Sequence, residues 1–137
     1  MQDYFHLHMD AKQLQSVSET ALAHVGDGVF ELLIRSWLCC HGVLTNQELH
    51  RQTVALVTAP AQADFVARLL PLLTEEEMAV YRRGRNCHTH PAPKSATPGQ
   101  YARATGLETL LGWLYLTGQT ERINTLFVVG MEAEHAL

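Results

Sequence analysis

The sequence predicts an all-α protein, and three observations support that fold class. Apolar residues recur at helical spacing through most of the 137 residues. Two capping boxes, in which a threonine is followed three residues later by a glutamate, stand before such stretches. No stretch shows the strict apolar and polar alternation of a half-buried β-strand. We therefore expect residues 1–137 to form a single domain, a bundle of five to seven helices.

The first half of the chain contains two predicted helices before a proline. Residues 18–40 carry apolar side chains at helical spacing, and Gly42 can end that helix. The letters TNQE at 45–48 are the first capping box, and they predict a helix that runs to about Val57. Pro60 then interrupts the pattern, because proline lacks an amide donor and fits best in the first turn of a helix.

The second half of the chain is divided by a predicted loop. We expect a helix over residues 61–73 and another that opens at the second capping box, TEEE at 74–77, and ends near Gly84. Residues 84–100 hold three prolines and two glycines, a composition typical of a loop. The last two predicted helices cover residues 101–116, ended by Gly118, and residues 119–129.

The composition is that of an ordinary globular protein, with 47% hydrophobic and 18% charged residues. No apolar run reaches the ~18 residues that a membrane span needs. The chain starts without a basic segment followed by a hydrophobic block, so we expect no signal peptide and a cytoplasmic protein. The three cysteines include no CxxC pair, which favours reduced thiols over disulfides or a zinc site.

Positive charge is concentrated in one part of the chain, although the net charge is −4. Residues 78–107 contain no Asp or Glu, yet they hold five of the ten Lys and Arg residues. Such a local excess can attract phosphates even in an acidic protein. His88 and His90 lie in the same stretch, but with no third ligand nearby we expect no metal site there. The five cations are Arg82, Arg83, Arg85, Lys94 and Arg103.

Two carboxylates, those of Asp27 and Glu108, stand within apolar helical segments. A lone buried carboxylate is costly, so each must be paired, hydrogen-bonded or bound to a metal. Each also has two glycines nearby, and a helical glycine costs up to about 1 kcal/mol relative to alanine. That cost is tolerable where another helix or a ligand comes close. We therefore expect two helices packed through small residues, with both acids facing one pocket that suits Mg²⁺. The glycines are Gly26, Gly28, Gly106 and Gly112.

Structural roles for acids of this kind stay open on these observations alone. A buried acid can cap a helix or pair with an arginine. Glu31 lies one turn after Asp27, so it can join the same face, or it can simply pair with Arg35 four residues on. We expect Glu31 to support the site rather than to bind the metal.

Five segments, in this order, resemble a known family. "HVGDGVFELLIR" resembles the ribonuclease III signature, and "GLETLLGWLYL" resembles the second acidic helix of that family. Between them lie "LHRQTVALVTAPAQA", "LTEEEMAVYRRGRN" and "PKSATPGQYARATG". Their order and spacing are similar to Mini-ribonuclease III, the short form without a double-stranded-RNA-binding domain. The resemblance covers residues 16–126.

This resemblance implies a homodimeric, all-helical endonuclease that cuts double-stranded RNA with Mg²⁺. Asp27 matches the catalytic and metal-binding Asp of the family, and Glu108 matches its Glu. The implied task is maturation of large-subunit (23S) ribosomal RNA from its precursor, and a ribosomal protein is a candidate further partner. The alternative is a non-catalytic RNA-binding dimer of the same fold, although such a protein has no reason to keep both acids.

The sequence departs from the longer ribonuclease III enzymes at two acidic positions, where it has Ala23 and Thr105. The acid cluster is therefore expected to be thin. The short form tends to have Lys where this chain has Pro60, and an aromatic residue where it has His24. We expect His24 to pack beside the site, together with Glu31 and Thr105, rather than to bind metal.

Binding of the RNA duplex is assigned to the basic stretch. A-form duplexes are recognised by shape and by phosphate and 2′-hydroxyl contacts, for which cations and amides are suited. The alternative role of the arginines is to end a helix, where they complement its dipole. The candidate RNA-binding residues are Arg82, Arg83, Arg85, Asn86 and Lys94.

Overall fold

The structure, a computed structural model, describes residues 1–87 and 91–135, the last three of these by their backbone alone. All regular elements in these ranges are helical, as the sequence predicts. The elements are α1 (Ala11–Gln15), α2 (Glu19–Cys40), α3 (Asn46–Leu56), α4 (Ala59–Leu69), the short 3₁₀ helix η1 (Leu70–Leu72), α5 (Glu75–Arg85), α6 (Pro98–Leu116) and α7 (Thr120–His135). His88 and His90 lie outside the described residues.

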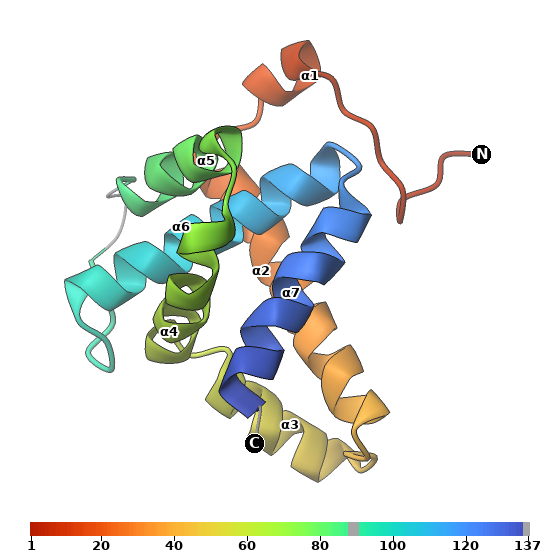
Figure 1. The fold of residues 1–137 in the computed structure, drawn as a ribbon, viewed down its shortest axis with the longest axis vertical. Helices are drawn as coiled ribbons and strands as arrows, with labels where there is room; N and C mark the ends of the chain where they lie inside the picture. Colours follow the sequence, from red (N-terminus) through yellow and green to blue (C-terminus); the bar gives the residue numbers. More distant parts are fainter. Residues whose placement is uncertain (88–90, 136–137) are drawn as a thin grey trace.

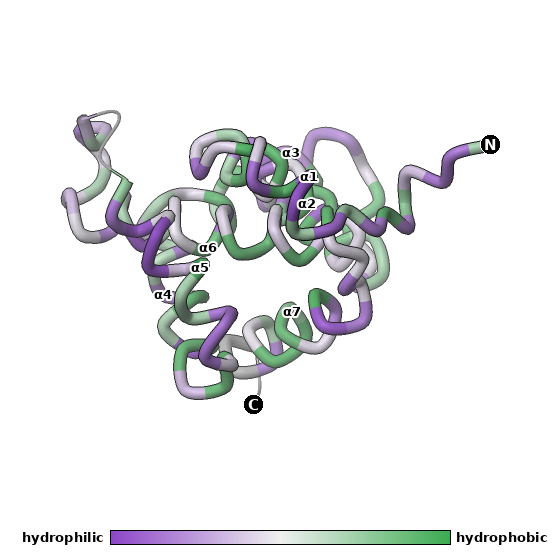
Figure 2. Tube along the Cα trace, turned by 90° about the horizontal axis from the view of Figure 1, so that it is seen from above, coloured by the Kyte–Doolittle hydropathy of each residue, from purple (hydrophilic) through white to green (hydrophobic). Residues whose placement is uncertain are grey.

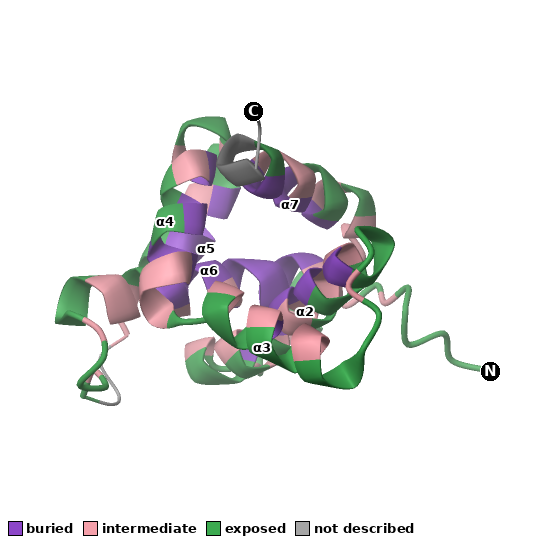
Figure 3. Cartoon of the chain, turned by 90° about the horizontal axis from the view of Figure 1, so that it is seen from below, coloured by how far each residue is buried: buried purple, intermediate pink, exposed green. Residues whose placement is uncertain are grey.

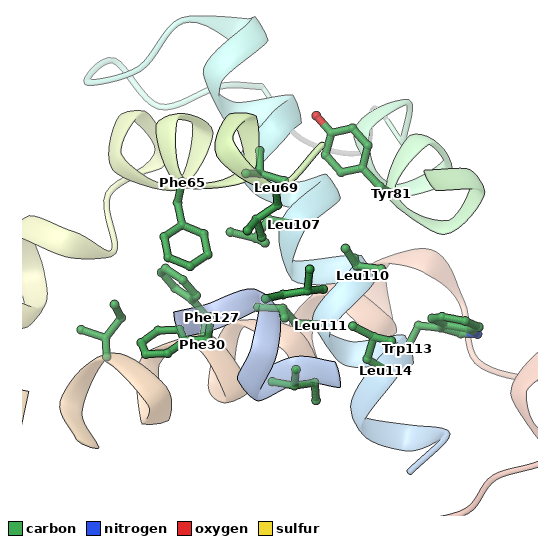
Figure 4. Packing of buried hydrophobic residues seen from close by; sticks show 14 of the residues in the cluster. Phe30, Phe65, Leu69, Tyr81, Leu107, Leu110, Leu111, Trp113, Leu114 and Phe127 are labelled. Atoms are coloured by element: carbon green, nitrogen blue, oxygen red, sulfur yellow. The ribbon is translucent and has the colours of Figure 1, made fainter. Parts of the chain in front are cut away.

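Helix α6 lies at the centre of the bundle (Figure 1), in contact with α2, α4, α5 and α7. It is buried around most of its circumference, which is typical of a helix with neighbours on several sides. Figure 4 shows leucines of α6 pointing towards different neighbouring helices. Its fully buried leucines are Leu107, Leu110 and Leu114. A helix in this position can carry a polar residue to the surface only where its neighbours leave a gap.

Three phenylalanines from α2, α4 and α7 join these helices beside α6 (Figure 4). The ring of Phe30 lies edge-on to Phe65, with 5.1 Å between centroids, and 6.4 Å from Phe127. Such edge-to-face pairs contribute about 0.5–1.5 kcal/mol beyond the burial of their area. Figure 3 shows the buried faces of α2, α4, α6 and α7 turned towards this common interior. In Figure 2, hydrophilic and apolar segments alternate along the helices, as expected when one face of each is buried.

The capping signals are only partly as predicted. At the start of α5, Thr74 and Glu77 form the complete capping box. At the start of α3, Thr45 accepts a hydrogen bond from the Glu48 amide, but the Glu48 carboxylate contacts Arg51 and Gln52 instead of closing the box. Two boxes that were not predicted join Asp10 to Gln13 at the start of α1 and Thr97 to Gln100 at the start of α6.

Several predicted boundaries are wrong. Helix α6 begins at Pro98 rather than at residue 101, because Thr97 caps it and proline is favourable in the first turn. The loop expected over residues 84–100 is therefore shorter, since α5 also continues to Arg85. For the same reason α4 begins at Ala59, with Pro60 in its first turn. The remaining differences are the added helix α1 (Ala11–Gln15), the 3₁₀ turn Leu70–Leu72 and an α7 that continues to His135.

A buried ion pair holds the start of α5 against the start of α7. The side chain of Glu77 is 4% exposed, and both of its oxygens accept hydrogen bonds from Arg122 at 2.8 Å. Arg122 also donates to the Leu72 carbonyl oxygen. These contacts hold the pKa of the Glu77 carboxyl below its usual value. Within the described part of the chain, no helix has the length and apolar character needed to cross a membrane.

Candidate active site

Helix α2 carries Asp27 on the border of its buried face. Ser18 caps the helix by accepting a hydrogen bond from the Ala21 amide. Its buried residues then recur every four positions, at Leu22, Gly26, Phe30, Ile34 and Leu38. Asp27 follows one of them directly and is exposed. The pattern that buries α2 therefore leaves this carboxylate at an edge of the helix pair rather than in the core.

Two glycines let α2 and α6 cross at close range. A Cβ placed on Gly26 would overlap the backbone carbonyl of Glu108 and lie 2.8 Å from the Gly112 amide nitrogen. A Cβ on Gly112 would in turn overlap the Leu22 carbonyl. The predicted packing through small residues is therefore correct for this pair. Gly28 plays no part in the crossing, since a Cβ there would meet nothing within 4 Å, and Gly106 packs against Tyr81 of α5.

This crossing places Asp27 and Glu108 in the wall of one groove, of about 220 Å³. Residues of α2 form one side, residues of α6 form the other, and Cys87, which follows α5, also lines the groove. The eight lining residues are Thr20, Ala23, His24, Asp27, Cys87, Tyr101, Thr105 and Glu108. Among the residues that the structure describes, no third His, Cys, Asp or Glu side chain joins these two acids in a cluster that could hold a metal ion through three protein ligands. The thin acid cluster expected from the sequence is thus a pair.

The pair is electrostatically strained. Burial raises the pKa of Glu108 from 4.5 to about 8, and the negative charge and hydrogen bond of Asp27 act in the same direction. A hydrogen bond from the Gln62 side chain opposes this rise. Ionising the Glu108 carboxyl in this half-buried place beside a second acid is costly unless a cation is bound there. Since Mg²⁺ is commonly held by one or two carboxylates and several waters, the donor set and the open groove fit this ion.

Of the three residues expected to support the site, two line the groove and one, Glu31, does not. His24 and Thr105 line the groove, together with Ala23, so the two positions that lack an acid do face the pair. The Thr105 hydroxyl donates to the Tyr101 carbonyl oxygen at 3.0 Å. Glu31 does not line the groove. It pairs with Arg35 at 3.0 Å, which is the structural alternative expected for this residue from the spacing of the two charges.

The candidate RNA-binding residues lie at the end of α5 and in the segment that follows, outside the groove lining. Arg83 pairs with Glu19 at 3.2 Å, which ties α5 to the first turn of α2. The guanidinium of Arg85 lies over the Tyr81 ring at 5.7 Å and donates to Asn86 at 3.3 Å. Arg82 and Lys94 are exposed. Arg83 and Arg85 therefore make structural contacts in addition to carrying positive charge.

Several residues of the site were not found by sequence reasoning. Thr20 and Tyr101 each precede an acid by seven residues, two helical turns, so helical spacing alone places them on the same face. Cys87 and Gln62 come from other elements and carry no such signal.

Comparisons with known proteins found a matching family, similar sequences and a similar solved structure. Residues 20–119 match the Ribonuclease III domain family. The chain is 48% identical over 103 residues to a Mini-ribonuclease 3 of Symbiobacterium thermophilum, covering 75% of this chain and 79% of that protein. It is 43% identical over 119 residues to a Mini-ribonuclease 3 of Enterococcus faecalis, covering 85% and 88%. A solved structure of a protein from Fusobacterium nucleatum superposes with a TM-score of 0.78 at 29% identity, over 88% of this chain and 97% of that one.

Proposed function

Because the chain belongs to the ribonuclease III family and is an endoribonuclease acting on double-stranded RNA, we propose that cleavage takes place in the groove of Asp27 and Glu108, with Mg²⁺ as the cofactor. The observation that carries the proposal is that these two acids line one groove at the α2–α6 crossing, where the charge of Asp27 raises the pKa of Glu108. We also propose that residues 1–137 act as one catalytic domain.

The protein's part in the reaction is to hold two negative charges side by side. Asp27 and Glu108 would bind the cation, and the buried surroundings of Glu108 strengthen its attraction for positive charge. When bound, Mg²⁺ neutralises charge on the phosphodiester and lowers the pKa of the attacking water. The groove walls of α2 and α6 would orient the RNA strand so that attack occurs in line. The products are a 5′-phosphate and a 3′-hydroxyl.

Cleavage of both strands calls for two such grooves, and we propose a homodimer that supplies them. The exposed apolar surface of α2 supports this part of the proposal. Leu32 is 55% exposed, and it lines an apolar hollow together with Val29 and Leu33. Gly28, one turn before Leu32, has open space around it. This surface lies within residues 21–40, the stretch from which we expect the interface.

The basic surface at the end of α5 would bind the phosphates of the duplex. Arg82 and Lys94 are exposed, and Arg85 and Asn86 follow Arg82 closely in the chain. Arg83 already pairs with Glu19, so its positive charge is less available to a phosphate. We propose as the natural substrate a precursor of large-subunit ribosomal RNA, which places the enzyme in the cytoplasm, and a ribosomal protein as the partner that presents it.

A cleavage assay tests the proposal. The protein is incubated with a long RNA duplex and, separately, with free nucleotides, in Mg²⁺ and then in excess EDTA. We expect the duplex alone to be cut, in Mg²⁺ only, with 5′-phosphates on the products. Binding of the duplex without cleavage would favour a non-catalytic RNA-binding dimer, and hydrolysis of the nucleotides would favour a different phosphohydrolase.

A further inference from the structure

A buried amide lies behind the carboxylate pair. Gln62 belongs to α4, which packs against α6, and it is 4% exposed. It does not line the groove, so its side-chain amide approaches Glu108 from inside the protein and favours the ionised carboxylate, lowering the Glu108 pKa, whereas Asp27 reaches Glu108 from the groove. The Glu108 carboxylate is thus held between a donor on its buried side and a second acid on its open side.

The orientation of this amide is determined by its other contact. The Gln62 side-chain nitrogen donates to the Val57 carbonyl oxygen at 3.0 Å, across the turn between α3 and α4. A primary amide nitrogen has two protons, so one can serve Val57 while the other serves Glu108. Exchanging nitrogen and oxygen would set the amide oxygen against two acceptors. Only one orientation of the amide therefore suits both neighbours, and it directs an N–H at the Glu108 carboxylate.

This arrangement costs stability. The Gln62 side-chain oxygen is buried without a hydrogen-bond partner among the described residues. An unsatisfied buried acceptor costs about 1–3 kcal/mol, and an apolar side chain of the same length would avoid that cost. A role in the packing of α4 alone would thus be better served by methionine. The amide at this position therefore points to a task that needs its N–H groups.

We propose that Gln62 is a positioning residue for metal binding, which holds the Glu108 carboxylate facing Asp27 so that both can bind one divalent cation. The inference rests on the proposed function, since it assumes that this pair is the metal site. Partners that orient metal ligands typically contribute 10–100-fold to affinity. We expect an effect of that size here, on the affinity for the ion rather than on the affinity for RNA.

The experiment measures binding of Mn²⁺ alone, by the loss of the free-ion EPR signal, to the full chain. The variant Gln62→Met keeps the length of the side chain and removes the amide. Gln62→Asn keeps the amide but is one methylene too short to reach both neighbours, and it replaces the first variant if that one fails to fold. Thr53→Val is the matched control, because it also removes a buried oxygen without a partner but lies on α3, away from Glu108.

We expect Gln62→Met to bind Mn²⁺ about 10–100-fold more weakly, with thermal stability unchanged or raised, and Thr53→Val to bind it like the unaltered chain. Raising the Mg²⁺ concentration should restore the cleavage rate of Gln62→Met without a change in KM for RNA. Lowered stability with normal Mn²⁺ binding would overturn the inference and leave Gln62 as a link between α3 and α4. If Asp27→Asn binds Mn²⁺ as well as the unaltered chain, the proposed metal site itself fails.

Discussion

The backbone carbonyl of Glu108 occupies the space that a side chain at Gly26 would need. Because Asp27 is the next residue on α2, this approach of the two helices brings the two acids together. Glycine costs up to about 1 kcal/mol in a helix, and at Gly26 the close packing of α2 against α6 offsets that cost. Gly112 has the same relation to the Leu22 carbonyl on the other side of the crossing.

Replacing Gly26 by alanine should separate the helices and disable the site. The overlap is with backbone, which cannot move aside as a flexible side chain can, so α2 and α6 must shift apart. We expect a loss of about 1–3 kcal/mol in the free energy of unfolding, as for other overpacked cores, and loss of RNA cleavage. Chemical denaturation and the cleavage assay measure the two effects.

Gly28→Ala is the matched control for this prediction. It lies on the same helix, and a Cβ there meets nothing within 4 Å. We expect the variant to be as stable as the unaltered chain or up to about 1 kcal/mol more stable, through helix propensity. Equal destabilisation by both substitutions would contradict the role given to the Gly26 approach.

Glu108→Gln should stabilise the protein in the absence of metal, at alkaline pH. The pKa of Glu108 is raised to about 8 in the folded protein from 4.5. The protonated Glu108 side chain therefore contributes its full stability below pH 4.5, and the folded protein loses that contribution as the pH rises through 8. Glutamine does not titrate, so the variant avoids this loss.

We expect the melting temperature of Glu108→Gln, measured in EDTA, to exceed that of the unaltered chain by on the order of 5 °C at pH 8.5 and to converge with it near pH 5. In an Asp27→Asn background, adding Glu108→Gln should raise the melting temperature by less, since the neighbouring negative charge is already removed. A constant difference across this pH range would mean that the Glu108 carboxylate is not perturbed in the folded chain.

Removing basic residues near the groove should weaken RNA binding and make the remaining binding less sensitive to salt. The triple variant Arg83→Gln, Arg85→Gln and Lys94→Gln is expected to bind a long duplex more weakly. The slope of log K against log salt should fall by about one for each phosphate that the variant no longer binds. Arg83→Gln alone should contribute least, because Glu19 already pairs with that side chain.

Arg51→Gln serves as the control for the salt series. Arg51 is exposed on α3 and pairs with Glu48, so it matches Arg83 in being a surface cation with an acidic partner. Its removal should leave the slope unchanged. A triple variant with an unaltered slope would show that the end of α5 does not bind the duplex.

Much of this fold could be predicted because local signals and packing agree. The apolar spacing of residues 18–40 and the glycines at the α2–α6 crossing reflect contacts that the structure contains. The start of α6 was missed because Thr97 and Gln100 lie in a stretch rich in proline and glycine, and that composition masked the cap. Helix α1 is too short for helical spacing to reveal it.

The site was predictable only along its two helices. Asp27 and Glu108 stand out as carboxylates in apolar segments, and their neighbours follow by helical spacing. Gln62 could not be found in this way, because its role depends on how α4 lies against α6 and on one carbonyl, that of Val57. Glu31 was a candidate by spacing alone, yet its carboxylate pairs with the arginine one turn further along the same helix.

In the proposed mechanism, Asp27 and Glu108 together form the metal site that cuts RNA. The most direct measurement is the initial rate of cleavage of a long RNA duplex in Mg²⁺ by Asp27→Asn, Glu108→Gln and the control Glu31→Gln, each with folding checked by circular dichroism. We predict that the first two lose at least about 100-fold in rate and that Glu31→Gln stays close to the unaltered enzyme. Cleavage by either Asp27→Asn or Glu108→Gln at the unaltered rate would mean that the replaced acid is not part of the metal site.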